Sequence, residues 1–127
     1  MARKRFPHSL TIAVIAKEDI AEIIHMFLAL EGFRTLVALS GQVGLEMIQA
    51  NIPDVLILDE LTPEIDGHKL YNIIVNDPEL KQIPIVFLKS GQIPRDWPIL
   101  KPEKNILLRV PIGTKKLLEA IEWVCNE

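Results

Sequence analysis

The sequence predicts an α/β domain in which five parallel strands form one sheet, in the order 2-1-3-4-5, with helices on both faces. Apolar runs alternate with amphipathic segments along the 127 residues, and this alternation is typical of repeated β-α-β units. The run at residues 55–58 is continuously apolar, as in a central parallel strand that is covered on both faces. Right-handed crossovers leave this strand order as nearly the only topology for such a succession of elements.

The first part of the chain shows a regular alternation of strands and helices. We expect strands at residues 11–16, 33–39 and 55–58, with helices at Glu18–Leu30 and Gly41–Ala50 between them. In the first of these helices, four apolar residues recur at helical spacing and predict one buried stripe. They are Ile20, Ile23, Ile24 and Phe27.

The second part continues the pattern with a helix at Gly67–Val75, strands at residues 85–88 and 106–108, and a last helix at residues 114–124. The apolar residues that the last helix should turn inward are Leu117, Leu118, Ile121 and Val124.

One crossover helix is missing from the pattern. Residues 90–105 contain Pro94, Pro98 and Pro102, four residues apart. A proline inside a helix costs about 3 kcal/mol, so only single turns that begin at a proline are compatible with this stretch. We therefore expect the fourth helix to be shortened or missing.

Composition favours a globular protein, since 49% of the residues are hydrophobic and 24% are charged. A net charge of −3 gives no reason to expect broad binding of nucleic acid. The lone Cys125 excludes an internal disulfide, and no apolar run reaches membrane-spanning length, so we expect a cytoplasmic address. Residues 10–125 should form the domain, and residues 1–9, with Arg3, Lys4 and Arg5, a flexible N-terminal arm.

The most informative segment spans residues 54–67, DVLILDELTPEIDG. An apolar strand ends at Asp59, Pro63 follows four residues later, and Asp66 and Gly67 follow seven and eight residues later. This pattern resembles the phospho-acceptor segment of bacterial response-regulator receiver domains. In that family a histidine kinase phosphorylates the aspartate at this position.

The resemblance covers about residues 10–124, and prolines at two further places, Pro84 before the fourth strand and Pro111 before the last helix, agree with it. It implies a flavodoxin-like (receiver-like) three-layer sandwich and a role in two-component (phosphorelay) signal transduction. In such a sheet, ligands bind beyond the carboxyl ends of the strands where the strand order reverses, and Asp59 should lie there. The alternative is a surface aspartate that caps a turn. The family's bond before the last proline is often cis, so we expect a cis Val110–Pro111 peptide.

Receivers bind Mg²⁺ through an acidic pair at the end of the first strand, and this chain has Ile15 and Ala16 at those positions. Neither side chain offers the oxygen ligands that Mg²⁺ requires. Glu18 and Asp19 are nearby and are weak candidates for substitute ligands, but acids at a helix start more commonly favour its dipole. We expect no cofactor, with Mg²⁺ only if the site works despite the missing pair.

The remaining active-site positions also depart from the family. The hydroxyl residue at the end of the fourth strand is replaced by Lys89, with Ser90 next to it, and the lysine of the fifth strand by Val110. Glu60 follows Asp59 and should line the site. We expect the ammonium of Lys89 to lie within ion-pair distance of Asp59, in place of the metal, or else to extend into solvent. The family's switching aromatic residue corresponds to Leu107, which cannot play that part.

Three function classes remain open. The favoured one is a pseudo-receiver that works by protein–protein interaction and does not act as an enzyme. The second is a genuine phosphoacceptor receiver that is switched by phosphorylation of Asp59. The third, a small flavodoxin-like enzyme or cofactor binder, lacks a nucleophile–base pair and a glycine-rich phosphate loop. Expected partners are a histidine kinase, a phosphotransfer protein or an output domain, without direct contact to nucleic acid or membrane.

Overall fold

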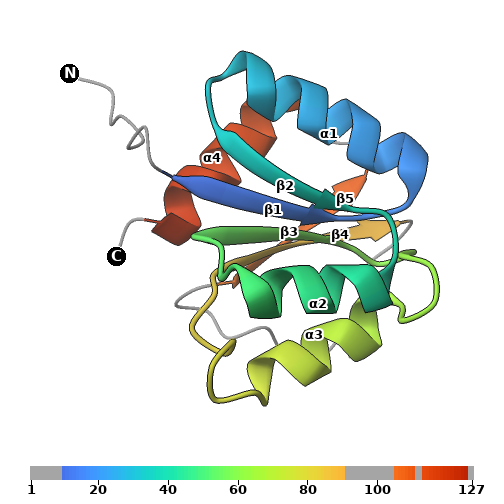
Figure 1. The fold of residues 1–127 in the computed structure, drawn as a ribbon. Coiled ribbons are helices and arrows are strands. Elements are labelled where there is room, and N and C mark those ends of the chain that lie inside the picture. Colours follow the sequence, from blue (N-terminus) through green and yellow to red (C-terminus); the bar gives the residue numbers. More distant parts are fainter. Residues whose placement is uncertain (1–9, 91–104, 111–112, 126–127) are drawn as a thin grey trace.

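The computed structural model describes residues 10–90, 105–110 and 113–125 (Figure 1). The strands are β1 (Thr11–Ile15), β2 (Arg34–Ala38), β3 (Val55–Asp59), β4 (Ile85–Ser90) and β5 (Asn105–Val110). The helices are α1 (Glu18–Leu30), α2 (Gly41–Ala50), α3 (Gly67–Val75) and α4 (Thr114–Cys125). Every predicted strand and helix in the described residues is present. The first three helices have the predicted bounds, and the ends that differ elsewhere do so by one or two residues.

The strands form one parallel sheet in the order β2-β1-β3-β4-β5, which confirms the predicted topology. The central strand β3 lies between β1 and β4, and all five of its residues are buried. This double coverage explains why its sequence is continuously apolar up to Asp59. At the end of β3, the register places Asp59 level with Leu88 of β4.

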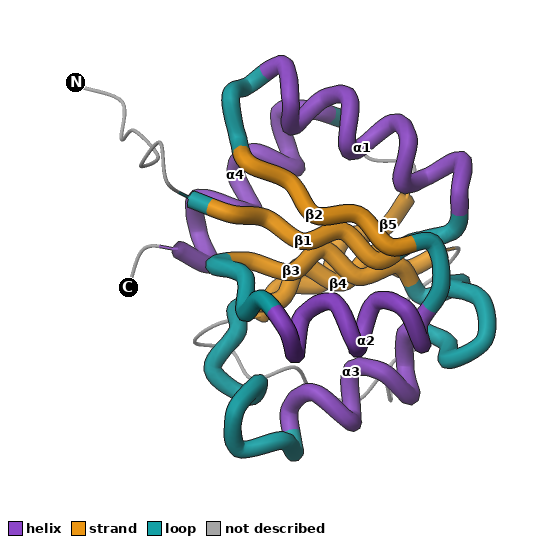
Figure 2. Tube along the Cα trace, viewed as in Figure 1, coloured by secondary structure: helices purple, strands orange, loops and turns teal. Residues whose placement is uncertain are grey.

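Two helical layers cover the sheet, with α1 and α4 on one face and α2 and α3 on the other (Figure 2). Because successive side chains of a strand point to opposite faces, neighbouring residues of β3 belong to different cores. Ile57 packs under α1 and α4, whereas Leu58 packs under α2 and α3. Each helix therefore stabilises the sheet through its own apolar stripe.

The buried stripe of α1 differs in part from the predicted one, since Ile24 is buried and Ile20 and Phe27 pack against the core as expected. Its buried residues are Ala21, Ile24 and Leu28, at spacings of three and four. Ile23 was wrongly assigned to this stripe, since 62% of its surface is exposed. Each helical residue is rotated by about 100° from the last, so the neighbour of buried Ile24 faces away from the sheet. Apolar character alone could not choose between Ile23 and Ile24.

Several expectations lie outside the described residues. The shortened fourth helix falls largely on residues 91–104, the predicted cis Val110–Pro111 peptide includes residue 111, and the N-terminal arm is residues 1–9. The side chains of Ser90, Leu107 and Val110 also lie outside the described part of the chain. Among the helices of the described residues, none combines the length and the apolar character needed to cross a bilayer.

Candidate functional site

Asp59 ends β3 at the carboxyl edge of the sheet, and only 1% of its surface is exposed. The strand order reverses between β1 and β3, so this residue stands at the switch point where open α/β sheets bind ligands. This burial contradicts the alternative of an aspartate at the surface, although the Leu61 amide, two residues further on, is among the donors to the carboxylate. The described geometry is that of a carboxylate held inside the edge of the sheet.

Burial disfavours the charged carboxylate and raises the pKa of Asp59 above its ordinary value. The neighbouring carboxylate of Glu60 adds to this rise. The backbone N–H groups of Leu61 and Lys17, together with the Lys17 ammonium, lower the pKa and so oppose burial. The amide of Lys17 donates to Oδ2 of Asp59 over 3.4 Å, which is a long hydrogen bond. Sequence reasoning did not single out Lys17, although it directly follows the position of the family's acidic pair.

The family's metal positions hold apolar side chains that belong to the core. Ile15 and Ala16 are both fully buried. Ile15 lies under α2 so closely that a Cβ on Gly44 would stand 2.6 Å from its side chain. Ala16 belongs to the core under α1 and α4. Magnesium needs oxygen ligands, so these residues do not fit the metal that receivers bind.

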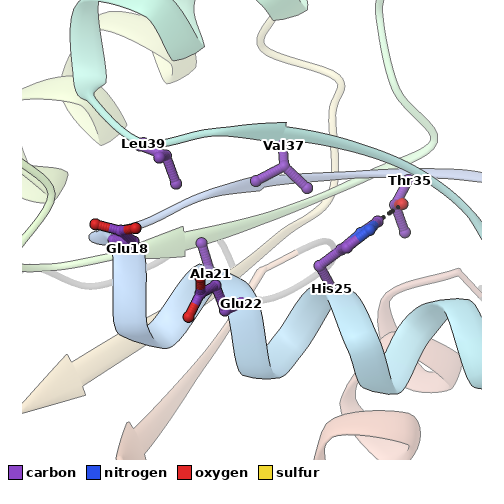
Figure 3. A pocket seen from close by; sticks show the side chains of 7 residues that line it. All are labelled: Glu18, Ala21, Glu22, His25, Thr35, Val37 and Leu39. Atoms are coloured by element: carbon purple, nitrogen blue, oxygen red, sulfur yellow. Dashed lines mark hydrogen bonds between the residues drawn. The ribbon is translucent and has the colours of Figure 1, made fainter.

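Glu18 and Asp19 do not supply the missing ligands in the described structure. Both are exposed in the first turn of α1, where the N-terminal dipole favours acidic side chains. Oδ1 of Asp19 accepts a hydrogen bond from the next backbone amide, and Glu18 lines a groove between α1 and β2 (Figure 3). Within the described residues, no group of three His, Cys, Asp or Glu side chains could hold a metal ion.

Lys89 pairs with Glu60, so the prediction of a Lys89–Asp59 ion pair was wrong. Its Nζ lies 2.8 Å from Oε2 of Glu60, and the two side chains are only 12% and 13% exposed. The cause is the register of the sheet. Asp59 is level with Leu88, so the next residues, Glu60 and Lys89, project from the opposite face.

His68 completes this cluster of Glu60, His68 and Lys89, which we call the Glu60 cluster. Nε2 of His68 lies 2.9 Å from the same Oε2 of Glu60. The imidazole ring also meets Phe87 edge to face, at a centroid distance of 5.6 Å. Sequence analysis gave His68 no role, because the turn after β3 brings residues 60 and 68 together only in three dimensions.

The turn after β3 is anchored to the backbone on both sides. The Thr62 hydroxyl is buried and donates to the carbonyl oxygen of Asp59 over 2.6 Å, with the carbonyl oxygen of Ile15 at 3.3 Å. Asp66 caps α3 by accepting from the Lys69 amide, and a Cβ on Gly67 would stand 2.5 Å from the Asp59 carbonyl oxygen. The Asp-Gly pair of the motif therefore holds α3 against the end of β3.

Two curated relatives illustrate what the chain is similar to. It is 34% identical over 64 residues to a probable cyclic di-GMP phosphodiesterase of Vibrio cholerae, covering 50% of this chain and 14% of that protein. It is 32% identical over 80 residues to the phosphate regulon transcriptional regulatory protein PhoB of Rhizobium meliloti, covering 62% of this chain and 35% of that protein. The chain thus spans a minor part of these relatives.

Solved structures agree in fold over most of the chain. A putative response regulator from Chloroflexus aurantiacus superposes with a TM-score of 0.80 at 24% identity, covering 94% of this chain and 99% of that one. The receiver domain of the sensor histidine kinase PA1611 from Pseudomonas aeruginosa, solved with magnesium in its active-site cleft, gives a TM-score of 0.77 at 17% identity, covering 93% and 99%.

A family model described as the response regulator receiver domain matches residues 14–122. This match includes the phospho-acceptor segment, the positions of the lost acidic pair and most of α4. Together with the fold and the place of Asp59 at the switch point, it establishes that this chain belongs to the response-regulator receiver domain family.

Proposed function

We propose that this receiver-like domain of two-component signalling acts as a pseudo-receiver, by protein–protein interaction and without phosphorylation of Asp59. The observation that carries the proposal is the pair of fully buried apolar residues, Ile15 and Ala16, at the positions of the family's metal ligands. Phosphoryl transfer depends on positioning and on neutralisation of charge by metal and cations. Without the metal ligands, the aspartate loses the group that would neutralise an incoming phosphoryl group.

The Glu60 cluster supports the proposal independently. Lys89 stands at the position of the family's hydroxyl residue. Its Nζ lies 2.8 Å from Oε2 of Glu60, on the face of the sheet opposite to the Asp59 side chain. In the family, the hydroxyl group at this position moves with the phosphoryl group on the aspartate. Lysine has no hydroxyl group, so Lys89 cannot take that part. Partners would be those of the family, namely a histidine kinase, a phosphotransfer protein or an output domain. On this proposal the chain is not an enzyme and needs no cofactor, and a cytoplasmic address stays a prediction.

The second candidate is a genuine phosphoacceptor, and the retention of Asp59 at the switch point favours it. One experiment separates the two candidates. The whole chain is incubated with acetyl phosphate with and without Mg²⁺, and its intact mass is measured. Asp59→Asn is the matched variant, and a receiver that keeps the acidic pair is the positive control.

We expect no phosphoryl adduct on this chain under conditions that modify the positive control. A Mg²⁺ titration followed by NMR should also leave the amide signals of Lys17 and Asp59 in place. A Mg²⁺-dependent adduct that forms on the unmodified chain and is lost in Asp59→Asn would establish the phosphoacceptor instead.

A further inference from the structure

A groove of about 350 Å³ runs along the edge of the sheet between α1 and β2 (Figure 3). Apolar side chains line it from both elements, namely Ala21 of α1 with Val37 and Leu39 of the β2 side. Val37 is 37% exposed and Leu39 is 46% exposed. The groove thus offers apolar surface that the described residues leave open to solvent.

The groove is lined by acidic side chains that give it a negative charge. Glu18 and Glu22 line it from α1, and both are exposed. At its far end, His25 and Thr35 close it with a hydrogen bond of 2.9 Å between Nδ1 and the hydroxyl oxygen. An occupant that combines apolar and basic side chains would match this lining.

The groove also borders an edge strand. Within the described sheet β2 pairs only with β1, so one side of its backbone is available for pairing with an extended segment. Such a segment would lie against Val37 and Leu39 and could reach the two glutamates.

Residues 1–9 of this chain have the composition that the groove requires. Arg3, Lys4 and Arg5 are followed directly by Phe6. Residues 1–9 lead into β1, whose first residue, Thr11, is level with Arg34 at the start of β2. Nine extended residues reach at most about 30 Å, whereas a five-residue strand is about 17 Å long, so the segment can cross one strand and follow the groove.

We propose that residues 1–9 bind the groove between α1 and β2 of their own chain, with the basic residues at Glu18 and Glu22 and Phe6 against Val37 and Leu39. This departs from the expectation of a flexible N-terminal arm. Attachment to β1 raises the local concentration of the segment to the millimolar range, so weak contacts suffice. Exposed ion pairs of this kind are screened by salt.

The test is NMR on the whole chain, with and without the substitutions Arg3→Ser, Lys4→Ser and Arg5→Ser. We expect the amide and methyl signals of Ala21, Val37 and Leu39 to shift in the variant. Raising the salt concentration should move the signals of the unmodified chain toward those positions and leave the variant unchanged. Unshifted groove signals would overturn the proposal.

A charge swap supplies the specific control. Glu18→Lys with Glu22→Lys should remove the contact, and adding Arg3→Glu, Lys4→Glu and Arg5→Glu should restore it. The matched control is Glu46→Lys with Glu79→Lys, which makes the same change of charge at exposed positions under the other face of the sheet and should leave the groove signals as they are. Melting curves verify that each variant is folded. Failure of the swap to restore the shifts would refute the ionic pairing.

A spin label distinguishes this chain's own segment from that of a second copy. With Cys125→Ser, a label on Ala2→Cys should broaden the signals of Val37 and Leu39 within the same molecule. Mixing isotope-labelled chains with unlabelled, spin-labelled chains should produce no such broadening. Broadening in the mixture would mean exchange between copies and would overturn binding within one chain.

Discussion

Asp59 occupies the position of the family's phospho-acceptor aspartate, but the residues around its carboxylate differ from those of the family. In this chain it is buried, with the Lys17 amide and ammonium on one side and Glu60 beside it in sequence. Its side chain projects from the face of β3 opposite to that of Glu60, so Lys89 cannot serve both carboxylates. Asp59 therefore keeps the sequence position of the family's aspartate, but the groups around its carboxylate determine its pKa.

At neutral pH, Asp59→Asn should raise the melting temperature, because burial penalises the ionised carboxylate and raises its pKa. The native state then binds a proton more readily than the unfolded state. The stability contributed by protonated Asp59 is complete below the ordinary pKa of 3.8 and is lost as the pH rises through the raised value. The gain from asparagine should therefore grow with pH across this window.

Thermal melts on both sides of that window measure the effect. The matched control is Asp19→Asn, at an exposed acid of the first turn of α1, which should show no such gain. A lower melting temperature of Asp59→Asn at neutral pH would contradict the account and would mean that the contacts to Lys17 outweigh burial.

Lys89→Met should destabilise the domain by about 1–3 kcal/mol, since it removes the ammonium from beside the largely buried Glu60 carboxylate. Combined with Glu60→Gln, the loss should be smaller than the sum of the single losses, with a coupling of about 0.5–3 kcal/mol. Denaturant unfolding of the four proteins measures this coupling. Lys69→Met, at an exposed lysine of α3, should change stability by at most about 0.5 kcal/mol. Additive losses would exclude a working Glu60–Lys89 pair.

Among the elements, α3 depends closely on one small residue. Gly67 opens the helix where a Cβ would stand 2.5 Å from the Asp59 carbonyl oxygen and 2.7 Å from the Glu60 Cα. Its amide also donates to the carbonyl oxygen of Glu60 over 3.0 Å. The glycine thus allows α3 to begin directly against the end of β3, which brings His68 to Glu60.

Gly67→Ala should cost about 1–3 kcal/mol, because backbone atoms must shift to admit the methyl group. Gly113→Ala is the matched control, since a Cβ there would meet nothing within 4 Å and its backbone is not left-handed. That substitution should be neutral or slightly stabilising. Chemical denaturation compares the two variants, and equal stabilities would contradict the close approach of α3 to β3.

Across the whole molecule, the protection of backbone amides against hydrogen exchange should be greater in the central strand than in the edge strand. β3 is buried along its length between β1 and β4, whereas β2 is an edge strand with exposed Arg34 and Val37. Local opening is easiest where few buried contacts are lost. We therefore expect the amides of β3 to exchange with solvent only on global unfolding and those of β2 to exchange earlier. Hydrogen exchange followed by NMR measures this difference, and equal protection of both strands would count against it.

The sequence by itself determined the strand order, the place of Asp59 at the switch point and the apolar residues at the metal positions. Alternation of elements, crossover handedness and residue identity are properties that the chain carries along its length. A residue without oxygen ligands is unfit for magnesium in any packing, so Ile15 and Ala16 could be judged from the letters alone.

Only the tertiary structure decided which side chains meet. The partner of Lys89 depends on a register that sets Asp59 level with Leu88, and a shift by one residue exchanges the faces of the sheet. The same packing chose Ile24 over Ile23 for the core and brought His68 to Glu60 across the turn after β3. These choices follow from contacts between distant segments, and no local pattern in the sequence records them.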